Sequence, residues 1–352
     1  MKIIPVATQR PYEVRVERGL LSRLGAELAP LTSARHVALI ADDTVDGLYG
    51  DKAAQALARE GFQVERMRFP HGESSKNLAA YAQMLDFLAE KRLTRADAVV
   101  ALGGGVTGDM AGFAAATYLR GVALVQAPTT FLAMVDSAVG GKTGVDLPAG
   151  KNLVGAFWQP LCVLCDPDVL QTLPPATFAD GTAEALKYGV LGSERLFDTL
   201  ATGSFADALE DVIATCLTEK ARLASEDETD RGSRQLLNLG HTIGHAIERC
   251  SGYAVSHGRA VAIGMVGATR IAVKMGLCGA DCLARLIAAL RANGLPTETD
   301  ETPENLLNAA LGDKKRMGDT ITFVLPRRIG ACELHPVPVT ELGAMLATAL
   351  EK

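Results

Sequence analysis

The chain has 352 residues, about twice the length of a typical domain, so we expect two domains, each with a core of its own. Hydrophobic residues make up 48% and charged residues 22%, as in soluble globular proteins, and the net charge of −6 argues against nucleic acid or an anionic membrane as the main partner. The sequence shows no secretory leader and no apolar run of the about 18 residues that a membrane span needs, and its seven cysteines are typical of a reducing compartment, so we expect a cytoplasmic protein.

The first half of the chain alternates short β-branched runs with helical patterns. The runs predict buried strands at residues 36–42, 96–102, 122–128 and 162–166. Apolar residues at i, i+3 and i+4 predict helices at residues 51–62 and 77–92. This alternation indicates βαβ units with a mainly parallel sheet, so residues 1–170 are expected to form an α/β domain.

The second half is almost wholly helical in pattern. Single apolar stripes predict helices at residues 182–190, 209–226, 260–275 and 280–294, and one pair of strands is predicted within residues 320–337. The proline-rich passage at residues 166–178 is the natural seam between the halves. We therefore expect a second, mainly helical domain over residues 171–352.

A glycine-rich turn lies between the strand predicted at 96–102 and the helix that follows it. Gly103, Gly105 and Gly108 match the spacing G-x-G-x-x-G, which lets the backbone approach a pyrophosphate at a helix N-terminus. A tight turn with close helix–sheet packing would use the same glycines. No acidic residue stands about 20 positions later to hold a ribose, so the candidates for that role are Asp42, Asp43 and Glu73, each near the end of a strand-like segment.

Three of the six histidines stand close together in the second half. His241 and His245 share one face of a helix, and their spacing alone predicts a pair of zinc ligands. His257 and Glu184 are further candidate ligands. Hydrogen-bonded core histidines, and a surface ion pair between Glu184 and Lys187, are the plainer alternatives. Polar residues in apolar settings accompany them and favour an anionic ligand such as phosphate or carboxylate: Asp136, Lys142, Lys151, Asn152, Arg234 and Asn238.

Six segments resemble, in order, the 3-dehydroquinate synthases, a family of sugar-phosphate cyclases. They begin with ALGGGVTGDMAGFAAATYLRG, QAPTTFLAMVDSAVGGKTGVDLPAGKNLVGAFWQP and LPPATFADGTAEALKYG, and they end with LLNLGHTIGHAIE, HGRAVAIGM and DKKRMG. The resemblance implies a Zn²⁺ ion (or Co²⁺) held by Glu184, His241 and His257, with His245 facing the substrate. It also implies NAD, bound by Asp43, Glu73, Ser74, Ser75, Lys76, Gly104, Gly105, Val106, Thr107, Gly108, Asp109, Thr129, Thr130, Lys142 and Lys151.

The reaction implied by the resemblance converts 3-deoxy-D-arabino-heptulosonate 7-phosphate to 3-dehydroquinate and phosphate, a step of the shikimate pathway of aromatic amino-acid biosynthesis. Transient oxidation by NAD at C5 acidifies the neighbouring C–H, phosphate is eliminated, the ketone is reduced again, and an intramolecular aldol step closes the ring. The implied phosphate and proton-transfer group is Lys142, Asn152, Lys187 and His245. The implied carboxylate and hydroxyl clamp is Arg234, Asn238, Lys220 and one of Lys314 or Lys315, with Asp136 nearby.

The resemblance also implies a homodimer, because Arg120 matches a position that reaches into the neighbouring subunit. Two positions depart from the family pattern: Asp230 stands where many members have Glu, and Arg259 follows His257 where an acid is frequent. The first alternative is a metal- and NAD-dependent polyol or alcohol dehydrogenase, which would not need the cationic clamp. The second is another sugar-phosphate cyclase, which would be expected to lose the carboxylate clamp or alter His245.

Overall fold

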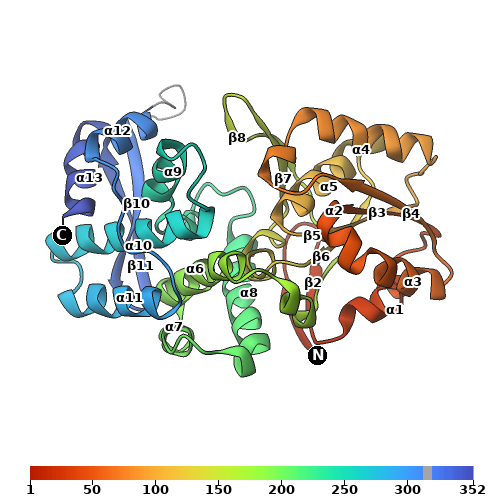
Figure 1. Ribbon diagram of the computed structural model, residues 1–352, viewed down its shortest axis with the longest axis horizontal. Coiled ribbons are helices and arrows are strands. Elements are labelled where there is room, and N and C mark those ends of the chain that lie inside the picture. Colours follow the sequence, from red (N-terminus) through yellow and green to blue (C-terminus); the bar gives the residue numbers. More distant parts are fainter. Residues whose placement is uncertain (312–318, 352) are drawn as a thin grey trace. The chain divides into compact units, whose positions relative to one another are not determined.

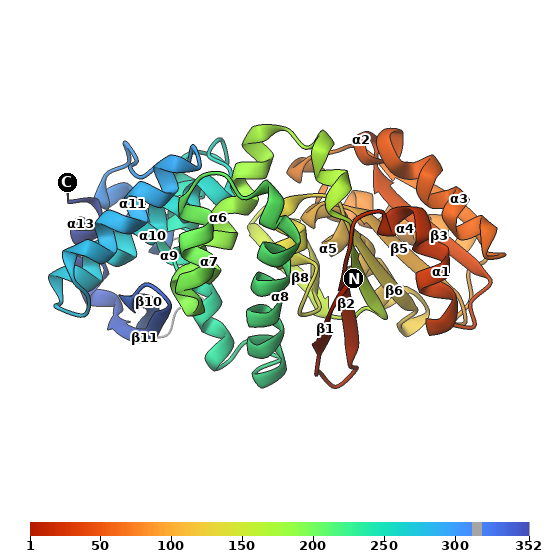
Figure 2. The ribbon, with the colours of Figure 1, turned by 90° about the horizontal axis from the view of Figure 1, so that it is seen from below.

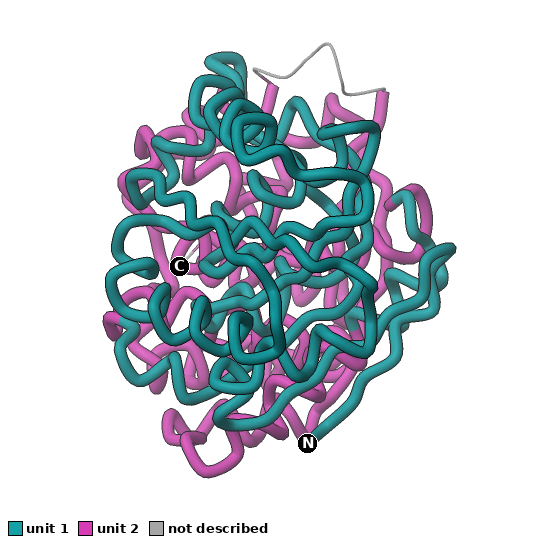
Figure 3. Tube along the Cα trace, turned by 90° about the vertical axis from the view of Figure 1, so that its right-hand side faces the viewer, with its two compact units in different colours: residues 1–173, 220–229 teal, residues 174–219, 230–352 magenta. Residues whose placement is uncertain are grey.

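The computed structural model describes residues 1–311 and 319–351. The chain forms two compact units, the first made of residues 1–173 with 220–229 and the second of residues 174–219 with 230–352 (Figure 3). Within the described residues, no helix is both long and apolar enough to cross a membrane.

Unit 1 is built on a seven-stranded sheet in the order β1-β2-β9-β6-β5-β3-β4. Its strands are β1 (Lys2–Val6), β2 (Tyr12–Val16), β3 (His36–Asp42), β4 (Gln63–Phe69), β5 (Ala98–Gly103), β6 (Ala123–Pro128) and β9 (Cys162–Cys165). Only the pairing of β1 with β2 is antiparallel, so the predicted mainly parallel sheet is confirmed. Every residue of β5 is buried, as expected for a central strand covered on both faces.

Helices cover both faces of this sheet (Figure 1 and Figure 2). They are α1 (Leu24–Leu28), α2 (Asp43–Val45), α3 (Asp51–Arg59), α4 (Leu78–Glu90) and α5 (Gly105–Thr117). Ala38 and Ile40 of β3 join the core formed with α4 and α5, whereas the alternate residues Val37 and Leu39 are buried on the opposite face of the sheet. Strands β7 (Lys142–Leu147) and β8 (Gly150–Phe157) form a separate antiparallel hairpin.

The strand order reverses once within the parallel part of the sheet. From β3 the chain moves outward to β4 at the edge, and it then returns to the opposite side of β3 to add β5, β6 and β9. In open α/β sheets such a reversal leaves a crevice at the carboxyl ends of the two strands between which the order changes, here β3 and β5.

Unit 2 is mainly helical, as predicted, with one strand pair, β10 (Thr320–Arg328) and β11 (Ala331–Pro338). Its helices are α6 (Pro175–Gly192), α7 (Glu194–Ala201), α9 (His241–Cys250), α10 (His257–Lys274), α11 (Ala280–Ala292), α12 (Pro303–Leu311) and α13 (Leu342–Leu350). Helix α10 is central, buried along most of its length and in contact with α6, α9, α11, α13 and β10. Helix α8 (Leu209–Glu226) begins in unit 2, and its residues from Lys220 onward belong to unit 1.

Helices α9 and α10 approach each other at glycines. A Cβ atom at Gly264 would overlap the carbonyl oxygen of Gly240, and Gly240 itself has a left-handed φ of 79°. Only glycine avoids both conflicts, because it lacks the Cβ atom and tolerates positive φ. This close approach sets where α9 begins relative to α10, and both helices begin at a histidine.

Gly264→Ala is expected to lower the free energy of unfolding by about 1–3 kcal/mol, because the added methyl group must push the two helices apart. The matched control is Gly343→Ala in α13, where the new Cβ would lie an ordinary 3.5 Å from Leu307 and where alanine favours the helix. Urea unfolding of both variants measures the difference. Equal stability of the two variants would contradict the close approach.

Candidate functional site

The side chains predicted to hold a dinucleotide lie at one edge of the unit 1 sheet. They follow the carboxyl ends of four strands: Asp43 follows β3, Glu73 follows β4, Gly104 follows β5 and Thr129 follows β6. These strands are parallel neighbours, so their carboxyl ends meet at the same edge. The reversal of strand order falls between Asp43 and Gly104, where sheets of this kind bind ligands.

The glycine-rich turn opens helix α5. Gly104 is the N-cap residue and has no capping side chain, so the first N–H groups of α5 can face an anion. A Cβ atom at Gly104 would lie 2.9 Å from Thr130, and one at Gly108 would lie 2.8 Å from Gln126 of β6. Glycine therefore serves both the turn and the packing of α5 on the sheet. The other predicted residues share these turns: Ser74, Ser75 and Lys76 after Glu73, and Gly105, Val106, Thr107 and Asp109 in α5.

A small hollow lies at this edge, with room for about one water molecule. It is lined by Thr129, Pro128, Leu102, Asp166 and Val169, among others. The buried hydroxyl of Thr129 makes no hydrogen bond within the described part of the chain, and such a group normally has a partner. Asp166 lines the hollow but serves the fold: its carboxylate accepts hydrogen bonds from the N–H groups of Gly19 at 2.8 Å and Leu21 at 2.9 Å.

Asp43 is exposed and is held by its neighbour His71. The Nδ1 atom of His71 lies 2.8 Å from Oδ1 of Asp43, and the backbone N–H of His71 donates to the same oxygen at 3.1 Å. These hydrogen bonds lower the pKa of Asp43 below its ordinary value. An ionised, oriented carboxylate at this point can accept hydrogen bonds from ribose hydroxyls.

A buried lysine links the glycine-rich helix to the hairpin. The Nζ atom of Lys76 donates to Asp109 at 2.5 Å and to the side chain of Asn152 at 2.6 Å. Burial disfavours the ammonium, but the charge and hydrogen bond of Asp109 outweigh it and raise the pKa of Lys76. Asn152 has a left-handed φ of 57°, and its N–H donates to Asp146 at 2.7 Å. Asp146 was missed by sequence reasoning; it faces Asn152 only because the hairpin folds back.

The remaining unit 1 residues lie around the same hairpin and its flanks. Lys151 forms an ion pair with Glu73 at 3.3 Å. Lys220, in the returning part of α8, binds both the carboxylate and, at 2.7 Å, the carbonyl oxygen of Asp136. Lys142 is exposed at the first residue of β7, and Arg120 is exposed in the turn after α5.

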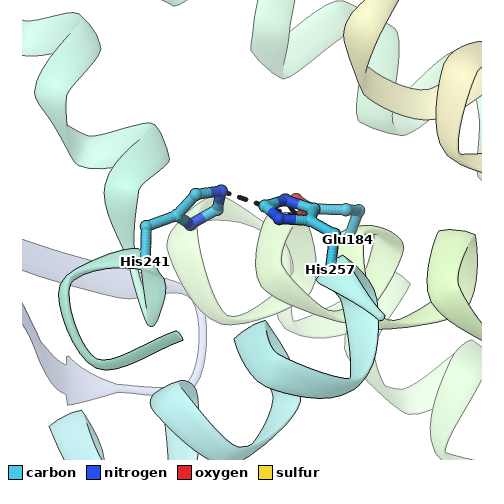
Figure 4. Close-up of side chains that lie close together, drawn as sticks. All are labelled: Glu184, His241 and His257. Atoms are coloured by element: carbon cyan, nitrogen blue, oxygen red, sulfur yellow. Dashed lines mark ion pairs between the residues drawn. The ribbon is translucent and has the colours of Figure 1, made fainter. Parts of the chain in front are cut away.

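Three potential metal ligands meet in unit 2 (Figure 4). Glu184 comes from α6, His241 is the first residue of α9 and His257 is the first residue of α10. Oε1 of Glu184 lies 3.2 Å from Nε2 of His257 and 3.6 Å from Nε2 of His241. Ligand atoms about 2.0–2.2 Å from a tetrahedral zinc ion are about 3.3–3.6 Å apart, so the spacing fits Zn²⁺.

Each histidine is oriented through its other ring nitrogen. Nδ1 of His241 lies 3.1 Å from the carbonyl oxygen of Leu239, and Nδ1 of His257 lies 3.2 Å from Oε2 of Glu248. Both partners accept, so Nδ1 carries a proton in each ring and Nε2 is the nitrogen that faces Glu184, the orientation found in metal-binding histidines. The third candidate, Glu184, also pairs with the buried Lys187 at 2.6 Å.

The two histidines have opposite electrostatic surroundings. Burial disfavours the charged form of both. For His241 burial dominates and lowers the pKa to about 3. For His257 the hydrogen bonds and charges of Glu184 and Glu248 outweigh burial and raise the pKa to about 10. The pocket therefore favours a positive charge beside His257, which a proton or a metal ion can supply.

Of the other predicted unit 2 residues, His245 lies beside this centre. His245 is exposed one turn along α9, with its ring 5.3 Å from that of His241 and 5.9 Å from that of His257. Arg234 is buried in the 3₁₀ turn before α9, and Asn238 ends that turn with its side chain exposed. Lys314 and Lys315 lie outside the described residues.

The two residues that depart from the family pattern, Asp230 and Arg259, differ in their exposure to solvent. Asp230 is half-buried at the start of the returning unit 2 segment. Arg259 is exposed, and its backbone N–H donates to Asp180 at 3.2 Å. Asp180, also missed by sequence reasoning, accepts a second hydrogen bond from Ser256 at 2.6 Å, so it holds the start of α10 on both sides of His257. Asp180 precedes Glu184 by one helical turn, so the sequence spacing could have predicted that both side chains lie on the same face of α6.

Comparison with known proteins identifies the relatives of this chain. Family models described as 3-dehydroquinate synthase N-terminal and 3-dehydroquinate synthase C-terminal match residues 66–180 and 181–316. The chain belongs to the 3-dehydroquinate synthase family. It is 44% identical to a 3-dehydroquinate synthase from Cereibacter sphaeroides over 97% of this chain and 96% of the relative. It is 42% identical to one from Streptococcus gordonii, covering 98% and 99% of the two chains.

Solved structures of other enzymes resemble the structure of this chain. A 2-deoxy-scyllo-inosose synthase complexed with carbaglucose-6-phosphate, NAD⁺ and Co²⁺ is 28% identical, with a TM-score of 0.88 over 98% of this chain and 99% of that one. A 2-epi-5-epi-valiolone synthase from Streptomyces hygroscopicus with NAD⁺ and Zn²⁺ bound is 30% identical, with a TM-score of 0.87 over 96% of each. A probable glycerol dehydrogenase from Sinorhizobium meliloti, at 17% identity and a TM-score of 0.62 over 96% and 95%, shares the fold alone.

Binding of Zn²⁺ to the metal-free protein is expected to release about one proton near neutral pH. His257, with its pKa raised to about 10, is then protonated and must lose its proton, whereas His241, with its pKa lowered to about 3, is already neutral. The affinity should therefore rise about tenfold per pH unit between about pH 6 and 8. Calorimetric titration in two buffers of different ionisation enthalpy measures the proton count. An affinity that does not change with pH would contradict a protonated His257.

Proposed function

We propose that this chain catalyses the 3-dehydroquinate synthase reaction, converting 3-deoxy-D-arabino-heptulosonate 7-phosphate to 3-dehydroquinate and phosphate. The observation that carries the proposal is the oriented trio Glu184, His241 and His257 in a chain 44% identical to curated synthases over nearly its full length. We propose NAD and Zn²⁺, with Co²⁺ as a substitute, as the cofactors, supported by the ligands named for the related cyclase structures. The proposed location is the cytoplasm.

The two cofactors supply reversible oxidation. When bound, NAD would supply a reversible hydride acceptor for C5 of the substrate, and a zinc ion held by Glu184, His241 and His257 would supply a Lewis acid for the oxygen at that carbon. The temporary ketone acidifies the adjacent C–H, which allows phosphate to leave by elimination. No net redox change results, so each NAD serves many turnovers.

The residues of the chain would bind and orient the cofactors and the substrate. In unit 1, the N-terminus of α5 would hold the pyrophosphate, Asp43 would accept hydrogen bonds from a ribose, and Lys76 would keep Asp109 and Asn152 in place. In unit 2, His241 and His257 present their Nε2 atoms beside Glu184. The cationic residues Lys142, Lys187, Arg234 and Lys220 would bind the phosphate and carboxylate of the substrate, and His245 would move a proton.

The dehydrogenase alternative has less support. Its solved representatives share only the fold with this chain. A simple polyol also carries no anionic group that would use a buried arginine such as Arg234, which is 1% exposed.

The first test measures phosphate release from the heptulosonate phosphate when the reaction contains much less NAD than substrate. Many phosphates released per NAD, without lasting NADH absorbance, are expected because the hydride is returned in each cycle. His241→Ala should abolish release while the protein stays folded, because one metal ligand is lost. NADH that accumulates with simple polyols, without phosphate release, would place the protein among the dehydrogenases instead.

We also propose a homodimer in which Arg120 completes the neighbouring active site. Arg120 is exposed, and its turn is fixed: Leu119 and Arg120 have φ of 51° and 67°, and the guanidinium Nε–H of Arg95 donates to the carbonyl of Leu119 at 3.0 Å. Mixing the inactive variants Arg120→Ala and His241→Ala should restore about a quarter of wild-type activity after subunit exchange, since one site of each mixed dimer is intact. No restored activity, or an Arg120→Ala variant that is active alone, would contradict the role in trans.

A further inference from the structure

Glu248 is a buried carboxylate that the metal site does not need as a ligand. It lies on α9 and is 3% exposed. We propose that Glu248 is a positioning residue: it fixes the ring of His257 toward the metal and thereby sets the metal affinity of the site. The inference rests on the proposed function only in taking Glu184, His241 and His257 as ligands.

The three ligands differ in how firmly packing holds them. The side chain of Glu184 is 2% exposed and that of His241 is 14% exposed, whereas that of His257 is 34% exposed. The ring of His257 therefore has the fewest neighbours to restrict its rotation. Its hydrogen bond from Nδ1 to Oε2 of Glu248, at 3.2 Å, supplies the restriction that packing does not.

Helix α6 holds the backbone around His257 in place. Asp180 of α6 accepts hydrogen bonds from Ser256 and from the N–H of Arg259, and a Cβ atom at Gly258 would overlap the backbone of Asp180. The start of α10 is thus seated on α6, and rotation of the His257 side chain is the freedom that remains. Glu248, from α9, acts on that rotation.

The two histidine ligands also have chemically different partners. Nδ1 of His241 faces a neutral carbonyl oxygen, that of Leu239, whereas Nδ1 of His257 faces a carboxylate. A negatively charged acceptor makes the opposite ring nitrogen a stronger donor to a metal. Removing the charge of Glu248 should therefore weaken the site even where a hydrogen bond is kept.

The same carboxylate lies beside His245. Residues 241, 245 and 248 stand at i, i+4 and i+7 on α9, so they share one face of the helix. One ligand atom each from His245, Glu248 and His257 lie within 4.8 Å of one another. These three side chains could themselves hold a cation, which is the competing interpretation that the test must separate from positioning.

The test measures Zn²⁺ affinity of chelator-treated protein by competition with a chromogenic chelator, for wild type, Glu248→Gln and Glu248→Ala. Glu248→Ala is expected to weaken binding about 10- to 100-fold, as loss of such partners does elsewhere. Glu248→Gln should weaken it less, because its amide oxygen can still accept from Nδ1. The visible spectrum of the Co²⁺ form should change in Glu248→Ala, reporting altered ligand geometry. Glu194→Gln, which removes an exposed carboxylate that pairs with Arg285, is the matched control and should bind as wild type.

Thermal unfolding of the metal-free variants separates positioning from folding. Glu248→Gln changes little volume, so it keeps the test decisive if Glu248→Ala does not fold. Zinc affinity within twofold of wild type in both variants would overturn the proposal. So would a second bound metal ion that Glu248→Ala loses while the first keeps its affinity.

The outcome is independent of the proposed reaction. If wild type binds zinc and the variants bind it weakly, the inference stands even where no phosphate is released. If wild type turns over and the variants keep full zinc affinity, the inference alone fails. Added zinc should restore activity to Glu248→Ala, because the residue acts through His257 and not on the substrate.

Discussion

The carboxylate of Glu184 is almost completely removed from solvent, and such a group is stable only where positive charge and hydrogen-bond donors surround it. Lys187 supplies one charge from the next turn of the same helix, at 2.6 Å. The two histidines supply the rest only when a proton or a metal ion accompanies them. Much of the local structure of unit 2 serves this requirement, because α9 and α10 both begin at a residue that faces Glu184.

Helices α6 and α9 carry their site residues at the same spacing. On α6, Asp180, Glu184 and Lys187 stand at i, i+4 and i+7; on α9, residues 241, 245 and 248 do the same. One stripe therefore combines a residue that anchors α10, a ligand and a balancing cation. The other combines a ligand, a group suited to proton transfer and an orienting carboxylate. Glycines at the crossing of α9 and α10 let the α9 stripe come close to α10, and Gly258 does the same for the α6 stripe.

Local pattern predicted the buried parts of the fold well. Strands β3, β5, β6 and β9 are short, mainly apolar runs that are buried along most of their length, so their composition marks them. Strand β4, with the sequence QVERMRF, lies at the sheet edge with Arg66 and Arg68 exposed, and its pattern does not mark a strand. The β7–β8 hairpin was missed because glycine, lysine and asparagine dominate its centre. In the site, spacing placed two histidines on one helix face, but the contact between Glu248 and His257 depends on how two helices meet, which no single segment encodes.

The path of the chain has a consequence for how such a protein can be divided or recombined. The connections at 173/174, 219/220 and 229/230 each pass from one compact unit to the other, so neither unit is a continuous stretch of sequence. A gene cut at the proline-rich seam would give a first fragment without Lys220, the partner of the half-buried Asp136. The proline-rich passage is visible in the sequence, but a cut there divides unit 1, because residues 220–229 of that unit lie beyond it.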